Sequence, residues 1–151
     1  MKILGGGTDH VHWYVKDLDK AMELLSKVLG SDFQVPFVLK DWKSRQSMNR
    51  VGLELIEPWT PDPELTNEMK ENVTDRILAL SFRVESLDEA VAELESYGLR
   101  VKRRFEMPGV CRDAIFDPSD TFGVAIELTE LGPLWDATFE EAFGRDEERV
   151  L

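Results

Sequence analysis

The chain has 151 residues, with 30 acidic side chains against 18 basic ones and a formal net charge of −12. This acidity excludes an ordinary nucleic-acid binder, whose phosphate contacts need surplus Lys and Arg, and it disfavours adsorption to an anionic membrane. No apolar run reaches the roughly 18 residues of a membrane-spanning helix, and the first residues lack a signal-peptide pattern. The single Cys111 excludes an internal disulfide. We expect a cytoplasmic protein.

An internal repeat organises the chain. The sequence VKDLDKA at 15–21 recurs as VESLDEA at 84–90, and VGLEL at 51–55 recurs as VAIEL at 124–128. Such self-similarity in the same order indicates two copies of one supersecondary unit. We predict a single domain, residues 1–151, built from two modules and two additions: modules at about 8–58 and 76–130, an acidic connector at 59–75 and a C-terminal helix at 131–151.

Each module reads as a strand, a helix and further strands. The first helix begins after the capping residue Asp17 and ends at Gly30, and the second begins after Ser86 and ends at Gly98. Apolar spacing along both helices is one-sided, as in a helix that covers a sheet. The class is therefore α+β. The remaining strand-like segments are 33–39 and 50–57 in the first module, and 99–105, 114–116 and 123–128 in the second.

Period-two alternation assigns side chains to the two faces of the first strand of each module. In the first module Val11, Trp13 and Val15 form the apolar set, which leaves His10, His12 and Tyr14 on the other face. In the second module the apolar set is Leu78, Leu80, Phe82 and Val84, which leaves Ala79, Ser81 and Arg83 on the matching face.

Two carboxylates interrupt apolar strands at equivalent positions of the repeat. Glu54 lies opposite Val51, Leu53 and Leu55, and Glu127 lies opposite the apolar residues of the last strand. A carboxylate in such a place is costly unless it is paired, hydrogen-bonded or bound to a metal. Both residues are therefore candidates for the functional site.

These segments resemble the vicinal oxygen chelate superfamily, which includes glyoxalase I, methylmalonyl-CoA epimerase, extradiol dioxygenases and bleomycin-resistance proteins. DHVHWYVKDLDKA at 9–21 looks like its opening strand and helix, and LELIEP at 53–58 and FDPSDTFGVAIEL at 116–128 look like its metal-bearing strands. The resemblance is strongest to the epimerase-like members. It implies two βαβββ modules whose eight strands form a curled mixed sheet around an open cavity.

The resemblance also implies a divalent metal held at four positions, which here are His10, Glu54, Ala79 and Glu127. Alanine cannot donate to a metal, so three ligands remain: His10, Glu54 and Glu127. These could hold Mg²⁺, Mn²⁺, Fe²⁺ or Co²⁺ with waters, and Zn²⁺ fits this set less well. His12 lies about 6.5–7 Å along the strand from His10, at about 3.3 Å per residue, and is not expected to replace the lost ligand.

The implied activity is that of a metal-assisted isomerase or lyase that passes through an enediolate on a small acid, ketone or acyl thioester. Glu54, Glu127 and His12 are the candidate catalytic residues, although His12 is equally open to a structural, hydrogen-bonded role. The alternative is a protein that binds or sequesters a small molecule without turnover, as bleomycin-resistance proteins do, and Ala79 favours it. A dioxygenase is the weakest alternative, because its iron needs the missing histidine.

Three further residues are candidates for substrate binding: Tyr14, Ser81 and Arg83. A guanidinium at Arg83 could bind a substrate carboxylate, and the alternative is a rim residue in a surface salt bridge. Basic residues at 100–104 and 40–50 would favour an anionic small-molecule ligand if they border the site, and otherwise they protect an edge strand. We expect a homodimer, with Trp135, Phe139 and Phe143 as contact residues or as packing over the sheet.

Overall fold

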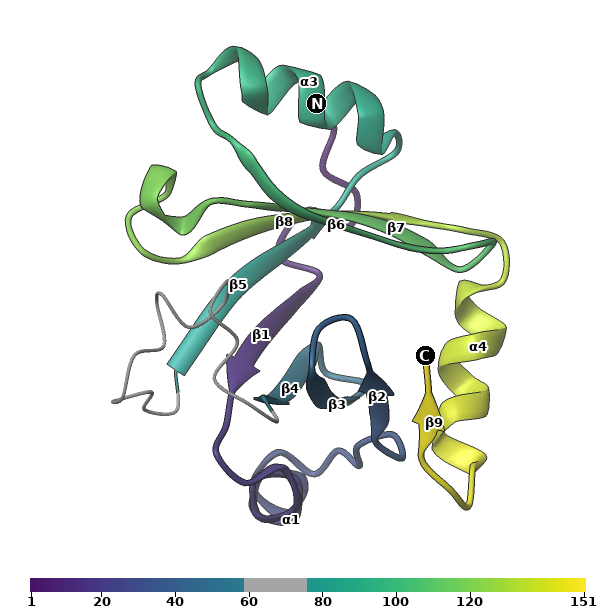
Figure 1. Cartoon of the computed structure of the whole chain (residues 1–151). Helices are drawn as coiled ribbons and strands as arrows, with labels where there is room; N and C mark the ends of the chain where they lie inside the picture. Colours follow the sequence, from purple (N-terminus) through teal and green to yellow (C-terminus); the bar gives the residue numbers. More distant parts are fainter. Residues whose placement is uncertain (59–75) are drawn as a thin grey trace. The chain divides into compact units, whose positions relative to one another are not determined.

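The computed structural model describes residues 1–58 and 76–151 (Figure 1). The connector predicted at 59–75 lies outside the described residues. The chain forms two compact units: unit 1 is Met1–Val11 with Leu78–Glu140, and unit 2 is His12–Ile77 with Glu141–Leu151. Strand β1 (His10–Tyr14) begins in unit 1 and continues in unit 2.

Unit 1 contains a four-stranded part of the sheet in the order β6-β7-β8-β5. Neighbours β6–β7 and β7–β8 are antiparallel, whereas β5 and β8 are parallel, with Ser81 opposite Glu127. The elements are β5 (Arg76–Arg83), α3 (Leu87–Ser96), β6 (Val101–Met107), β7 (Cys111–Phe116), the 3-10 helix η1 (Pro118–Asp120), β8 (Ala125–Leu131) and α4 (Trp135–Glu141).

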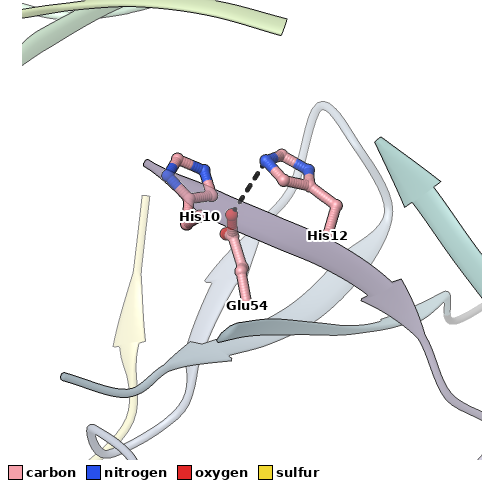
Figure 2. Close-up of side chains that lie close together, drawn as sticks. All are labelled: His10, His12 and Glu54. Carbon is pink, nitrogen blue, oxygen red and sulfur yellow. Dashed lines mark ion pairs between the residues drawn. The ribbon is translucent and has the colours of Figure 1, made fainter. Parts of the chain in front are cut away.

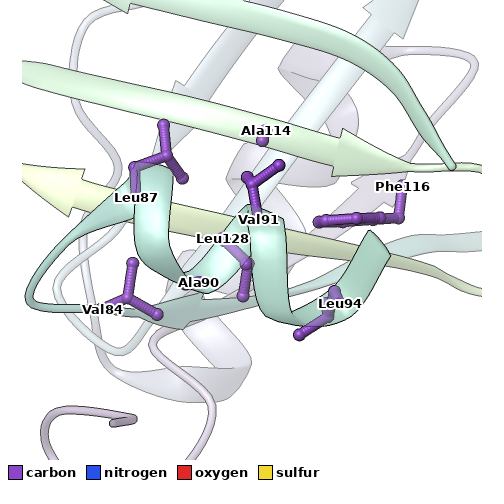
Figure 3. Close-up of a cluster of buried hydrophobic side chains, with 8 residues drawn as sticks. All are labelled: Val84, Leu87, Ala90, Val91, Leu94, Ala114, Phe116 and Leu128. Carbon is purple, nitrogen blue, oxygen red and sulfur yellow. The ribbon is translucent and has the colours of Figure 1, made fainter. Parts of the chain in front are cut away.

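The core of unit 1 lies between helix α3 and the sheet (Figure 3). Leu87, Val91 and Leu94 of the helix contact Phe116 and Leu128 of the strands, and Phe82 and Ile126 pack against the same cluster. This confirms the face assigned to Phe82 and Val84 in the sequence. It follows that Ala79, Ser81 and Glu127 point to the face of the sheet opposite α3, because strand residues alternate.

Unit 2 contains β4, β3, β2 and β9 in that order, with β1 next to β4. The pairs β3–β4 and β2–β3 are antiparallel, and the two-residue strand β9 runs parallel to β2. The elements are α1 (Leu18–Leu29), β2 (Phe37–Leu39), β3 (Ser44–Met48), β4 (Leu53–Pro58), the 3-10 helix η2 (Ala142–Gly144) and β9 (Arg149–Val150).

The core of unit 2 is Val15, Leu18, Phe33 and Leu55, with Trp13, Leu25 and Leu53 packed against it. The predicted inward position of Val51 is wrong, since that side chain is 60% exposed. Strand β4 begins only at Leu53, and Val51 lies in the preceding turn. There the Asn49 side chain accepts hydrogen bonds from the backbone N–H groups of Val51 and Leu53.

Both helices begin and end where the sequence predicts. The Asp17 carboxylate accepts from the N–H of Lys20, and the Ser86 hydroxyl accepts from the N–H of Glu89, so each satisfies a donor that the first turn leaves open. At the other end Gly30 and Gly98 adopt positive φ of 62° and 91°, a conformation that favours glycine.

The α+β class and the mixed sheet are confirmed, and residues 1–58 and 76–151 contain nine strands in place of the eight predicted. The extra strand is β9, and it corrects the helix predicted over 131–151. Only Trp135–Glu141 is α-helical, followed by one 3-10 turn and the strand. Trp135 stacks on Phe139, whereas Phe143 lies under the guanidinium of Arg50. No helix in the described part of the chain is long and apolar enough to span a membrane.

Candidate functional site

Strand β1 presents two buried histidines on one face. His10 and His12 are two residues apart, so their side chains leave the same side of the strand, and they are 7% and 3% exposed. Trp13 packs into the core of unit 2, which holds the strand in this orientation. A buried imidazole needs polar partners, and each of these histidines has a carboxylate.

His10 lies between two carboxylates. Its Nδ1 is 2.9 Å from Oδ2 of Asp9, and its Nε2 is 3.2 Å from Oε2 of Glu127 on β8. Glu127 is as buried as the histidine, so solvent screens this contact weakly. The structure thus brings together His10 and Glu127, two of the residues predicted as ligands, and their role as ligands stays a prediction.

His12 pairs with the other predicted carboxylate, Glu54 of β4. Its Nε2 is 3.2 Å from Oε2 of Glu54, as Figure 2 shows. His10, His12 and Glu54 each offer a ligand atom within 4.8 Å of the others. The expectation that His12 lies too far along the strand is therefore wrong. The backbone spacing of about 6.5–7 Å does not apply to the ring nitrogens, because these lie at the ends of side chains on one face.

Asp9 is a site residue that the sequence reasoning missed. Its Oδ1 is 2.6 Å from a guanidinium nitrogen of Arg83, and its Oδ2 meets His10. The hydrogen bond with His10 lowers the pKa of Asp9 below its usual 3.8, and Arg83 lowers it further against the opposing effect of burial. Asp9 precedes the strand, so alternation did not place it with His10. The adjacent Asp-His pair was the available signal.

The other predicted residues occupy three kinds of environment. Arg83 is partly exposed and held by Asp9, Ser81 is buried with its hydroxyl 3.0 Å from that of Thr129, and Tyr14 is buried. Ala79 is fully buried and pairs with Ala125 across the β5–β8 register. Their roles in substrate binding stay predictions.

The two predicted basic groups carry local acidic partners. Arg100 contacts Asp117 and Asp120 of the η1 segment, which raises the pKa of Arg100 mainly through its hydrogen bond with Asp120. Arg45 contacts Asp19, Glu57 and Glu148. Each of these two arginines is therefore engaged by acidic side chains.

The donor set can be tested against a divalent cation by its spacing. Two donors about 2.1 Å from an octahedral ion and in adjacent positions are about 3 Å apart. Both His–Glu pairs, at 3.2 Å, are close to this value. His10, His12 and Glu54, whose ligand atoms lie within 4.8 Å of one another, suit Mn²⁺, Fe²⁺, Co²⁺ or Zn²⁺ better than Mg²⁺, which prefers oxygen. The residues present therefore fit a metal.

The chain is similar in sequence and structure to several methylmalonyl-CoA epimerases. Mitochondrial methylmalonyl-CoA epimerase of Bos taurus is 27% identical over 130 residues, which cover 83% of this chain and 74% of that protein. The crystal structure of methylmalonyl-CoA epimerase from Mycobacterium tuberculosis is 27% identical with a TM-score of 0.74, covering 91% of this chain and 95% of that one.

A Streptomyces coelicolor methylmalonyl-CoA epimerase variant, solved in complex with 2-nitronate-propionyl-CoA, has a TM-score of 0.71 at 23% identity. The match covers 83% of this chain and 96% of that one and shows a shared fold. Residues 9–116, more than half of this chain, match the family model of the glyoxalase/bleomycin resistance protein/dioxygenase superfamily. The chain belongs to that superfamily.

Proposed function

We propose that the protein is an epimerase-like isomerase that moves a proton at the carbon next to the carbonyl of an acyl-CoA thioester. The observation that carries the proposal is the pair of buried His–Glu contacts on β1, His10–Glu127 and His12–Glu54. The similarity to methylmalonyl-CoA epimerases supports the choice of an acyl-CoA substrate.

His10, Glu54 and Glu127 would hold a divalent cation, with His12 as a further donor close to His10 and Glu54. Such a cation supplies a positive charge that stabilises negative charge developing on the thioester oxygen. The first task of the protein is to keep these donors buried and in place, which its strands do through the core contacts of α1 and α3.

Proton transfer requires a base near the reacting carbon and an acid on the other face of that carbon. The candidates are the carboxylates of Glu54 and Glu127 and the imidazole of His12. Nε2 of His12 lies 3.2 Å from Oε2 of Glu54. We assign proton removal to Glu54, which would also be a ligand of the cation, and we assign Glu127 to holding the cation with His10.

A second candidate function is binding without turnover, and Ala79 is the observation that favours it. This residue stands where the family resemblance implies a histidine ligand, and its buried methyl group leaves the site one donor short. Such a protein would bind an acyl-CoA or another small anion and leave its stereochemistry unchanged.

Deuterium incorporation separates the two functions. Purified protein loaded with Mn²⁺ or Co²⁺ would be incubated with one epimer of methylmalonyl-CoA in D₂O, and NMR would follow label at the carbon between the two carbonyl groups. Glu54→Gln and Glu127→Gln should slow exchange by about 10²-fold or more. Glu106→Gln, on the exposed face of β6, is the matched control.

An isomerase incorporates deuterium and inverts the epimer in the wild type, and the control variant does the same. If the loaded wild type binds methylmalonyl-CoA, as seen by a rise in its melting temperature, yet produces neither exchange nor inversion, the isomerase proposal fails. Binding without turnover then becomes the function.

A further inference from the structure

The contacts of Asp9 assign this residue a role toward His10. We propose that Asp9 is a positioning residue: its carboxylate, held by Arg83, fixes the imidazole of His10 with the hydrogen on Nδ1 and with Nε2 directed at Glu127. The inference rests on the proposed function, because it concerns how a ligand of that site is presented.

The two carboxylate oxygens of Asp9 have different partners. Oδ1 accepts from Arg83 at 2.6 Å, and Oδ2 lies 2.9 Å from Nδ1 of His10. With one oxygen for each partner, the carboxylate cannot turn without losing one of the two contacts. The backbone also fixes it, since the N–H of Asp9 donates to the carbonyl of Ser81 at 2.8 Å.

The hydrogen between Asp9 and His10 can be assigned. Arg83 pairs with one oxygen of Asp9 at 2.6 Å, and a carboxylate paired with a guanidinium acts as a hydrogen-bond acceptor through its other oxygen, which lies 2.9 Å from Nδ1 of His10. The hydrogen of this contact is therefore on Nδ1. The lone pair of a neutral ring is then on Nε2, so Nε2 and Oε2 of Glu127, 3.2 Å apart, are both acceptors, as two ligands of one cation would be.

The contact with Asp9 prepares His10 to bind a metal through Nε2. A histidine that binds a metal through Nε2 must keep Nδ1 protonated, and a carboxylate on Nδ1 both fixes this tautomer and makes the ring a stronger donor. Asp9 meets this requirement, and Arg83 holds Asp9. Arg83 thus acts on His10 through Asp9.

NMR of the metal-free protein tests the tautomer directly. The chain has only two histidines, so long-range proton–nitrogen spectra of protein labelled with ¹⁵N-histidine contain two imidazoles. His12→Gln assigns them. We expect His10 to carry its hydrogen on Nδ1 in the wild type. In Asp9→Ala the hydrogen of His10 should move to Nε2, since Glu127 is then its acceptor. In Asp9→Asn, whose side chain keeps one acceptor oxygen, both tautomers should occur.

Calorimetric titration with Mn²⁺ alone measures the effect on binding. We expect Asp9→Ala to bind Mn²⁺ about 10- to 100-fold more weakly, as for other second partners of metal-binding histidines. Arg83→Gln should retain the Nδ1 tautomer of His10, and its affinity for Mn²⁺ should fall less than tenfold. The control is Asp88→Ala, which removes a carboxylate of α3 from its exposed ion pair with Arg112 of β7. It should change neither the tautomer of His10 nor the Mn²⁺ affinity.

The outcomes distinguish this inference from the proposed function. The inference is overturned if Asp9→Ala and Asp9→Asn both keep the wild-type tautomer and the wild-type Mn²⁺ affinity. Should Asp9→Ala not fold, Asp9→Asn still decides, because this variant is also expected to alter the tautomer of His10. A different outcome is a wild type that neither binds Mn²⁺ nor exchanges deuterium, while the tautomer of His10 still depends on Asp9. That result upholds the positioning of His10 and refutes the metal-assisted function.

Discussion

Replacing Ala79 with histidine should create a fourth ligand and raise the stability that a metal confers. Ala79 is fully buried on β5, and its register partner Ala125 is two residues from Glu127 on β8, on the same face. Residues at such diagonal positions lie about 7–8 Å apart, within reach of an imidazole. The histidine at position 79 and Glu127 can therefore approach one ion.

The magnitude follows from two opposing effects. Without metal, a larger side chain in this packed position should cost about 1–3 kcal/mol. If the new ligand tightens Mn²⁺ binding tenfold, saturating metal increases the free energy of unfolding by about 1.4 kcal/mol more than it does in the wild type. For a chain of this size that is a difference of about 3–6 °C in the metal-induced rise of the melting temperature.

Thermal unfolding with and without saturating Mn²⁺ measures this difference. Ala114→His is the matched control, because Ala114 is equally buried in a strand but faces the core under α3. It should lose stability in the same way and show the metal-induced rise of the wild type. The reasoning is refuted if Ala79→His and Ala114→His respond to Mn²⁺ alike.

Three further predictions concern stability. Phe116→Ala empties the centre of the α3 core, so urea unfolding should show a loss of about 3–5 kcal/mol, and a loss below 1 kcal/mol would contradict the packing described. Hydrogen bonds from Ser119 lower the pKa of Asp117, so the stability this residue contributes is present above pH 3.8 and is lost as the pH falls below it. Acid unfolding of Asp117→Asn should therefore depend less steeply on pH in that window, and an unchanged slope would refute the assignment. Arg45→Met removes the partner of Glu148 and should increase hydrogen exchange at β9 while β4 stays protected. Equal exchange at both strands would show that Arg45 does not fix the C-terminal segment.

The sequence predicted the helices because their ends are set by local chemistry. Asp17, Ser86, Gly30 and Gly98 each act on the neighbouring turn, and the structure places them at the helix ends. The face of the sheet to which each side chain of β5 and β8 points was equally predictable, since one face is apolar and is covered by α3. Such features need no knowledge of distant contacts.

The features that sequence reasoning missed depend on distant contacts. Strand β3 reads Ser-Arg-Gln-Ser-Met, without apolar alternation, and yet Ser44, Gln46 and Ser47 are buried because β2 and β4 satisfy its backbone on both sides. The role of Asp9 depends on Arg83, which another part of the chain supplies. The strand β9 exists only because the edge of β2 is open to it.

The contact between His10 and Glu127 joins a residue near the start of the chain to one near its end. Ordering such a long loop costs entropy, and parallel pairing such as that of β5 with β8 adds contacts between segments far apart in sequence. Both conditions slow folding. We therefore expect the site to form among the last native contacts, so that the imidazole signals of His10 report the completion of folding in a refolding experiment.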